Sequence, residues 1–234
     1  MKLSDLAGVL KTHQLPLLRS YQAADGCMVF EFDIAGKGVT WLPGQHGIFT
    51  IPGKEVSGRK WRAFSIASAP REGVLQIATK IGDEPSSFKA VLRALQPGEL
   101  IQLRGPFGWL YLQDHNSPVV MIAGGVGITP FRSIFKQLEE ENHRKVTLIY
   151  SARDTYLYQE ELDAIAAKDG QIEIVYTHNK EEVADALQTA LAENGTEAHY
   201  FISGTPGMVA GTVKTLRGAG VQKKKILTDS FRGY

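Results

Sequence analysis

The hydrophobic pattern of the chain changes near residue 115. Before that point, apolar and polar residues alternate in short runs separated by Gly or Pro, as expected of half-buried β-strands. The runs occupy residues 27–34, 47–51, 61–67, 74–81 and 100–105. The segment 86–95 instead places its apolar residues at helical spacing. This half therefore predicts an antiparallel β-barrel or sandwich with one helix.

The second half alternates strand-like and helix-like segments. The strand-like segments are nearly continuous in apolar residues and cover 118–123, 145–151, 171–178, 199–204 and 225–229. The helix-like segments cover 130–141, 155–168, 181–194 and 207–220. Apolar strands joined by helices are typical of a doubly wound parallel sheet with both faces covered. We therefore expect two domains, a β-domain over residues 1–114 and an α/β domain over residues 115–234.

The segment AGGVGITP joins the first strand of the α/β half to its first helix. Such a loop lies at the carboxyl edge of a parallel sheet, where ligands of doubly wound folds bind. Glycines let the backbone approach a ligand closely, and the helix start offers free N–H groups to a phosphate. The segment predicts a dinucleotide site, although it departs from G-x-G-x-x-G and a plain tight turn is the alternative. The residues concerned are Gly124, Gly125, Gly127, Thr129, as the helix cap, and Pro130, at the first helical position.

Composition narrows the class of protein. Apolar residues make up 43% of the 234 residues, charged residues 22%, and the net charge is +1. Neither a nucleic-acid partner nor a membrane surface is indicated by that balance. Cys27 is the one cysteine, so we expect no internal disulfide, iron–sulfur cluster or metal site. The polar N-terminal stretch and the lack of a long apolar run predict a cytoplasmic protein without a membrane span.

Five motifs in one order resemble the ferredoxin–NADP reductase superfamily. RAFSIAS resembles the family's Arg-x-Tyr-Ser flavin motif, GDEPSSF its flavin phosphate loop and GPFG the turn that follows. GGVGITP resembles the pyridine-nucleotide loop, and FISGTPGM the Cys-Gly-x-Pro-x-Met segment near the nicotinamide. These motifs lie at residues 62–68, 82–88, 105–108, 124–130 and 201–208. The resemblance therefore covers nearly the whole chain. The resemblance implies a flavin-binding antiparallel β-barrel, a nucleotide-binding α/β domain, and hydride transfer from NAD(P)H to bound FAD.

The resemblance assigns the flavin residues to the first half. Arg62 would clamp a flavin phosphate, because a planar guanidinium matches phosphate oxygens. Phe64, where the family usually has Tyr, would lie against the isoalloxazine ring, with an ordinary core aromatic as the alternative. Ser65 would approach flavin N5 as a catalytic residue. The separate phosphate loop favours FAD over FMN. The other predicted contacts are Ala63 within the motif, Thr79 and Lys80 through their backbone, and Ser86 and Ser87 at the helix start.

The nucleotide residues are expected in the second half. Ser151 and Arg153 follow the second strand, where an NAD site would carry an acidic residue. A hydroxyl and a cation suit a 2′-phosphate, so NADPH is favoured and NADH is the alternative. Ser203 stands where the family commonly has Cys, and with Gly204 it would lie beside the nicotinamide. The terminal aromatic Tyr234, or else Phe231, would cover the flavin face, with a frayed tail as the alternative.

The electron acceptor is expected to be a separate protein. Relatives in this family often carry a fused iron–sulfur or heme domain, and from its length and its single cysteine we expect neither in this chain. The resemblance therefore points to a ferredoxin, a flavodoxin or an oxygenase component, with free flavin, ferric chelates or quinones as diffusible alternatives. A second hypothesis is a flavin-binding electron-transfer or regulatory subunit that does not turn over nucleotide. A third is a binding module without a cofactor.

Overall fold

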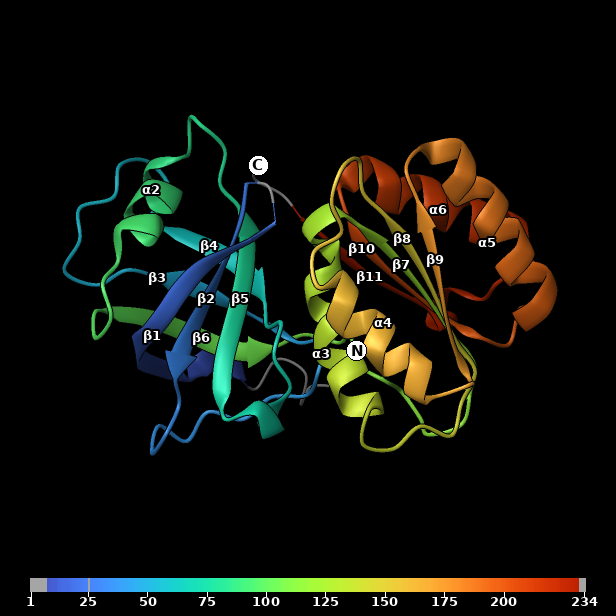
Figure 1. Cartoon of the computed structure of the whole chain (residues 1–234), viewed down its shortest axis with the longest axis horizontal. Coiled ribbons are helices and arrows are strands. Elements are labelled where there is room, and N and C mark those ends of the chain that lie inside the picture. The colour runs from blue at the N-terminus through green and yellow to red at the C-terminus, as the bar shows by residue number, and fades with distance from the viewer. Residues whose placement is uncertain (1–7, 25, 232–234) are drawn as a thin grey trace. The chain divides into compact units, whose positions relative to one another are not determined.

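The computed structural model describes residues 8–24 and 26–231. The chain divides into two compact units, of which the first ends at Tyr111 and the second begins at Leu112. The first is an antiparallel β-structure and the second an α/β structure, which confirms the predicted fold class (Figure 1). No helix among the described residues is both long and apolar enough to cross a membrane.

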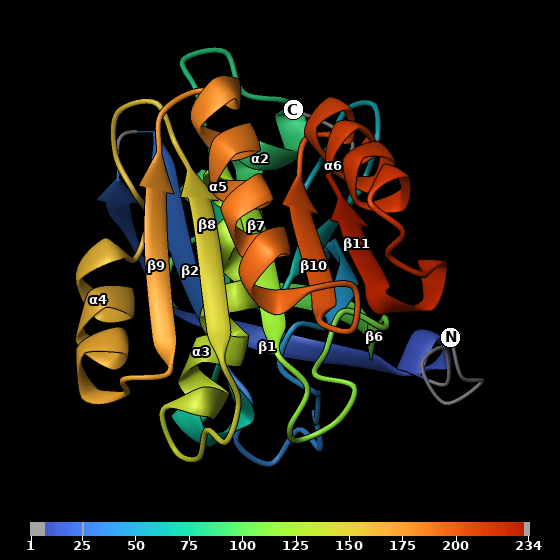
Figure 2. The same ribbon diagram turned by 90° about the vertical axis from the view of Figure 1, so that its right-hand side faces the viewer.

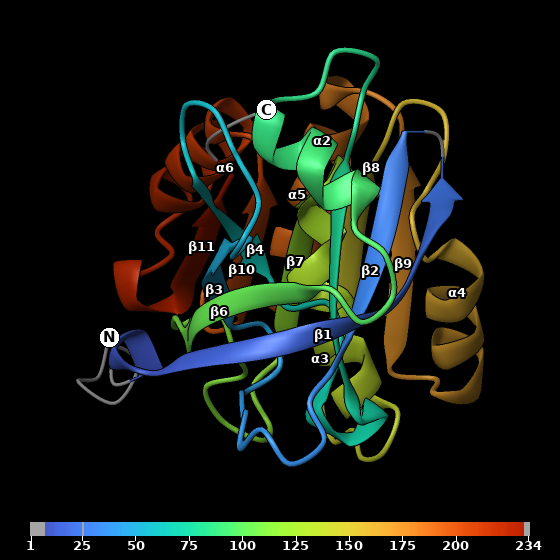
Figure 3. The same cartoon turned by 90° about the vertical axis from the view of Figure 1, so that its left-hand side faces the viewer.

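The first unit is built on one six-stranded sheet in the order β4-β3-β6-β1-β2-β5 (Figure 3). Every neighbouring pair of strands in this sheet is antiparallel. The strands are β1 Thr12–Ala24, β2 Cys27–Asp33, β3 His46–Thr50, β4 Trp61–Ser65, β5 Val74–Lys80 and β6 Leu100–Phe107. Helix α2, Ser87–Ala94, lies between β5 and β6 in the chain, and the 3-10 turns η1, Gly8–Leu10, and η2, Pro70–Glu72, complete the unit.

The sheet curls until its two edges meet. The backbone N–H of Ala67, just beyond β4, donates to the carbonyl of Gln76 in β5 at 2.8 Å. Ser68 adds to this seam, because its hydroxyl donates to the carbonyl of Val74 and accepts from the N–H of Gln76. The enclosed core is made of inward-facing aliphatic and aromatic side chains, with Phe88 and Leu92 of α2 packed against the strands. The barrel therefore has few unpaired edge groups.

The second unit is a five-stranded parallel sheet in the order β11-β10-β7-β8-β9 (Figure 2). Its strands are β7 Val119–Gly124, β8 Val146–Ser151, β9 Ile172–Thr177, β10 His199–Gly204 and β11 Ile226–Ser230. Its helices are α3 Thr129–Leu138, α4 Gln159–Lys168, α5 Lys180–Asn194 and α6 Pro206–Gly218, with short turns η3 Gly125–Ile128 and η4 Lys223–Lys225. Figure 2 shows α5 and α6 on one face of this sheet and α3 and α4 on the other. Apolar strands are thus covered on both sides, as the sequence pattern requires.

A tight turn precedes the parallel sheet and is organised by Asp114. The Asp114 carboxylate accepts from the N–H groups of Asn116 and Ser117 and from the Ser117 hydroxyl, at 3.1, 2.8 and 2.7 Å. The buried Arg144 guanidinium lies 3.5 Å from the same carboxylate. Burial disfavours the charged carboxylate, but these hydrogen bonds outweigh it and hold the pKa of Asp114 at about 2, below its usual 3.8. The turn is therefore stabilised by an ionised Asp114.

We expect Asp114→Asn to destabilise the protein by about 1 kcal/mol at neutral pH. The depressed pKa alone would correspond to a larger value, but the Asp114 side chain is 41% exposed, so solvent screening reduces it. Because the folded pKa lies below the unfolded one, the stabilisation is present above pH 3.8 and is lost as the pH falls toward 2. Urea unfolding should thus show a gap between wild type and variant that shrinks below pH 4. The exposed Asp185→Asn is the control, and a gap independent of pH would contradict the assignment.

Candidate functional site

The carboxyl ends of β7 and β10 form the topological switch point of the parallel sheet. From β7 the chain proceeds to β8 and β9 on one side and then returns to β10 and β11 on the other. In the register of the two central strands, Ser203 of β10 lies beside Ala123 of β7. Crevices at such a point bind ligands in doubly wound folds. The predicted glycine loop and the Ser203–Gly204 segment therefore come together at one place.

The three glycines of the loop have different surroundings. A Cβ on Gly127 would lie 2.2 Å from the carbonyl oxygen of Ser203, and one on Gly124 would lie 2.5 Å from Sδ of Met208. Gly125 has a φ of +52° and open space around the position of its absent Cβ. Two glycines thus allow the loop to pack against β10 and α6, and Gly125 alone presents open, exposed backbone. The expectation that Gly124, Gly125 and Gly127 contact a ligand stays a prediction.

The start of α3 differs from the predicted cap. Thr129 is the first residue of the helix, and its hydroxyl donates back to the carbonyl of Val126 at 2.9 Å. It therefore does not accept a backbone N–H, and the prediction that Thr129 caps the helix was wrong. Pro130 is the second residue of the helix rather than the predicted first, and its missing N–H still costs nothing in the first turn. No side chain caps this helix start, which continues directly from η3, and the N–H of Thr129 donates to the carbonyl of Val126.

Ser203 is fully buried, and its hydroxyl has no hydrogen-bond partner among the described residues. A buried hydroxyl without a partner is unfavourable by about 1–3 kcal/mol unless a ligand satisfies it. The neighbouring carbonyl of Gly204 accepts from the N–H of Phe231 at 3.0 Å. Phe231 is half-buried beside this segment, whereas Tyr234 lies outside the described residues. The unsatisfied Ser203 hydroxyl fits a polar ligand group at the switch point.

Ser151 and Arg153 lie at the end of β8, at the same edge of the sheet. Ser151 is half-buried, and Arg153 is exposed with no ion pair to Asp154 or to any other described residue. A cluster that the sequence analysis missed lies beside them. In it the Tyr156 ring packs edge-on against Tyr150 and Tyr176 at 5.0 and 4.6 Å. The Tyr156 hydroxyl donates to the carbonyl of Thr177 at 2.9 Å. The only sequence signal was the density of Tyr in this region.

The predicted flavin motif lies on β4, an edge strand of the antiparallel sheet. The Arg62 guanidinium donates to the carbonyls of Arg59 and Trp61 and lies 5.4 Å from the centre of the Phe88 ring. These contacts hold the cation at the first turn of α2, a suitable place for a phosphate. Ala63 is exposed on the strand, and Ser65 is buried.

Phe64 is a core residue. Its side chain is 9% exposed, and its ring lies 5.6 Å from Phe49 and 6.1 Å from Phe88. These contacts are those of an ordinary core aromatic, which was the alternative role considered for Phe64. A flavin ring can meet only the narrow exposed part of Phe64, so its contact with the isoalloxazine ring stays a prediction.

The start of α2 lies next to the end of β5. Ser86 is exposed and makes no cap hydrogen bond, while the Ser87 hydroxyl accepts from the N–H of Ser57 at 3.0 Å. Thr79 is buried, and the carbonyl of Lys80 accepts from Nζ of Lys89 at 2.7 Å.

Lys89 itself was missed by sequence reasoning. Burial lowers the pKa of its ammonium group, as does the nearby charge of Arg62. The resemblance places a flavin phosphate at this helix start, which has no side-chain cap. The cations of Arg62 and Lys89 and the exposed hydroxyl of Ser86 lie there, and these groups fit the negative charge of a phosphate. Among the described residues no group of His, Cys, Asp or Glu is arranged to hold a metal ion.

Comparison with known proteins agrees with the fold and with a nucleotide-binding family for the second unit. Residues 121–214 match the oxidoreductase NAD-binding domain family. The chain is 29% identical to one component of the Na⁺-translocating NADH-quinone reductase of Actinobacillus pleuropneumoniae, over 74% of this chain and 49% of the relative. It thus spans about half the length of the curated relatives it matches.

Two solved structures show the same arrangement of elements. Ferredoxin–NADP⁺ reductase from Plasmodium falciparum with 2′P-AMP matches with a TM-score of 0.82 and 19% identity, over 95% of this chain and 97% of that one. A flavohemoglobin from Malassezia yamatoensis with bound FAD and heme matches with a TM-score of 0.78 and 21% identity, over 94% of this chain and 60% of that one.

Proposed function

We propose that this chain is a member of the ferredoxin–NADP reductase superfamily and is the FAD-binding and nucleotide-binding part of an NAD(P)H-dependent reductase. The single observation that carries the proposal is the switch point. There an open glycine, an uncapped helix start and a buried hydroxyl without a partner lie at one edge of the sheet. This combination is suited to a phosphate and a polar ring substituent of the same ligand.

Each group of residues has a distinct task. FAD, when bound, supplies the chemistry that accepts a hydride from a reduced nicotinamide and releases electrons to an acceptor. Arg62 and the start of α2 hold and neutralise its phosphates, and Ser65 contacts the ring. The backbone of Gly125 and the start of α3 receive the nucleotide phosphates, and the Ser203 hydroxyl orients the nicotinamide amide. Binding and orientation are thus the contributions of this chain.

The preferred nucleotide is NADPH. Arg153 is exposed and unpaired among the described residues, and Ser151 precedes it on β8, so a cation and a hydroxyl are available for a 2′-phosphate. The electron acceptor is a separate carrier such as a ferredoxin, a flavodoxin or an oxygenase component. The names of the curated relatives specify NADH and quinone for those proteins, so NADH is the competing nucleotide.

Anaerobic stopped-flow mixing of the FAD-loaded chain with NADPH and with NADH tests this proposal. We expect both to bleach the flavin band and NADPH to do so faster. Ser203→Ala should slow bleaching several-fold while raising the free energy of unfolding of the nucleotide-free protein by about 1–3 kcal/mol, because it removes a buried hydroxyl that has no partner among the described residues. Bleaching by neither nucleotide would indicate an electron-transfer or regulatory subunit instead. A protein that takes up no FAD would indicate a module without a cofactor.

A further inference from the structure

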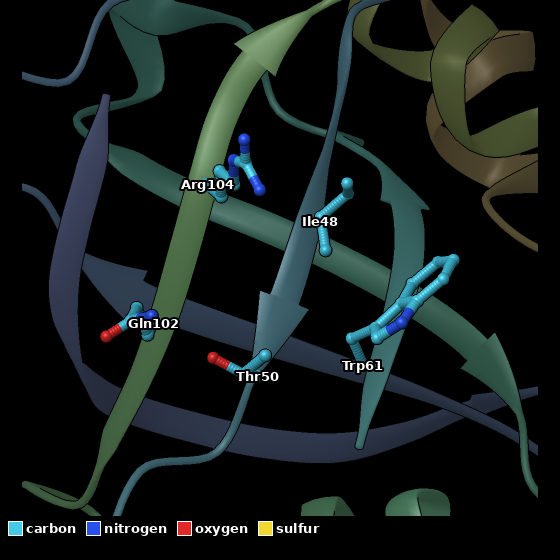
Figure 4. Close-up of a pocket in the computed structure, with 5 residues that line it drawn as sticks. All are labelled: Ile48, Thr50, Trp61, Gln102 and Arg104. Carbon is cyan, nitrogen blue, oxygen red and sulfur yellow. The ribbon is translucent and has the colours of Figure 1, made fainter. Parts of the chain in front are cut away.

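The outer face of the antiparallel sheet contains a hollow that the proposed reductase does not use. Along β3, β4 and β6 the side chains alternate, so that Phe49, Phe64 and Leu103 point into the core. The residues between them face outward and line a cavity of about 430 Å³. Its lining residues are Ile48, Thr50, Trp61, Gln102 and Arg104, which project from three adjacent strands (Figure 4).

Strand register brings these side chains together. Thr50 of β3 is paired with Trp61 of β4 and with Gln102 of β6, and Ile48 is paired with Arg104. Directly opposed positions in a sheet place their side chains about 5 Å apart. These five side chains therefore surround one small volume, whose exposed lining is mainly apolar and whose size lies within the range of small-molecule sites.

Trp61 gives the hollow an apolar platform. The side chain is 44% exposed, which is unusual for a large ring on a sheet face. The Arg59 guanidinium lies 5.0 Å from the centre of the Trp61 ring, within the range of a cation–π contact. This contact restrains the indole, so that less side-chain freedom is lost when a flat molecule stacks on it.

The surroundings of the hollow are positive. Arg104 lines it and Arg59 lies beside its platform, while the strands β3, β4 and β6 contain no Asp or Glu. Nε of Arg104 donates to the carbonyl of Val9 at 2.7 Å, which fixes the guanidinium and leaves its Nη groups for another acceptor. Arg104 is exposed and has no carboxylate partner among the described residues. An anionic occupant complements this charge.

We propose that this hollow is a binding site for a small planar aromatic anion, such as an aromatic carboxylate. The ring stacks on Trp61 against Ile48, and the carboxylate accepts hydrogen bonds from the Nη groups of Arg104. Thr50 and Gln102 supply the polar contacts that orient the molecule. The site involves neither the start of α2 nor the switch point, so it stands independently of the proposed reductase activity.

Titration calorimetry of the full chain, loaded with FAD, with 2-naphthoate tests the site, and 2-naphthamide is the uncharged control ligand. We expect one naphthoate per chain and binding of the amide that is at least about tenfold weaker. Arg104→Gln and Trp61→Ala should each weaken naphthoate binding about tenfold. Lys37→Gln, an exposed cation elsewhere in the same unit, should leave it unchanged. Circular dichroism confirms that each variant is folded.

Five outcomes overturn the proposal. An anion site would be excluded if the acid and the amide bound equally well, or if Arg104→Gln left the naphthoate affinity unchanged. It would also be excluded if no binding occurred at millimolar naphthoate. Binding of an acidic peptide that requires Trp61 and Arg104, without any naphthoate binding, would assign the face to a protein partner. Naphthoate binding only after removal of residues 1–7 would assign the hollow to a segment of this chain.

Discussion

Gly127→Ala is expected to lower the free energy of unfolding by about 3 kcal/mol and to slow flavin bleaching by NAD(P)H more than tenfold. The new methyl group would lie 2.2 Å from the carbonyl oxygen and 2.7 Å from the carbonyl carbon of Ser203. Those atoms belong to β10, which is paired with β7 on one side and β11 on the other. The backbone of β10 is therefore held in place and cannot move away from the methyl group. The loop must move instead, and the nucleotide edge is distorted. Urea unfolding and stopped-flow bleaching measure the two effects.

The matched control for this variant is Gly207→Ala. Gly207 lies in α6, and nothing lies within 4 Å of the position of its absent Cβ. Alanine is favoured over glycine in a helix, so stability should stay the same or rise slightly. If Gly127→Ala retained wild-type stability and bleaching, the close packing of the loop against Ser203 would be refuted.

Arg62→Gln is expected to weaken FAD binding between about tenfold and a hundredfold. The guanidinium is held at the start of α2 by two backbone carbonyls and by the face of Phe88, so its loss removes a positioned cation. Charge-assisted hydrogen bonds to phosphate are the strongest contacts that such a residue makes. Fluorescence titration of the apoprotein with FAD measures the change.

Arg93→Gln is the control for this second variant. Arg93 is exposed in the last turn of the same helix and therefore lies away from the proposed phosphate site. Its replacement should leave FAD binding unchanged and reduce stability by no more than about 1 kcal/mol through the helix dipole. Equal FAD affinity of Arg62→Gln and wild type would remove Arg62 from the flavin site.

Much of the architecture could be predicted because hydrophobic periodicity reports burial directly. The segment 199–204 was expected as a strand and is β10, and both layers of helices follow from the alternation in the second half. Strand β1 was missed. It runs over Thr12–Ala24, contains Pro16, and has irregular register with β2 near Leu17 and near Gln22. A proline and two register shifts interrupt the simple alternation by which strands are recognised.

The details of the candidate site were less accessible because they depend on contacts between distant segments. The sequence shows three glycines in a loop but not that Gly127 faces Ser203 of another strand. A lysine in a helix is ordinarily expected to be exposed, whereas Lys89 is buried and its ammonium group donates to the carbonyl of Lys80. The packing of Phe64 against Phe49 and Phe88 likewise comes from three separate segments. Local pattern carries no information on such neighbours.

The pairing of β1 has a consequence for the order in which the chain can fold as it is synthesised. β1 pairs with β2, the next strand to emerge, but its other partner is β6, the last strand of that unit. The barrel thus stays open on the ribosome until Leu100–Phe107 has left the exit tunnel, and its apolar interior depends on that late closure. In the parallel sheet, by contrast, β7, β8 and β9 dock in the order of translation.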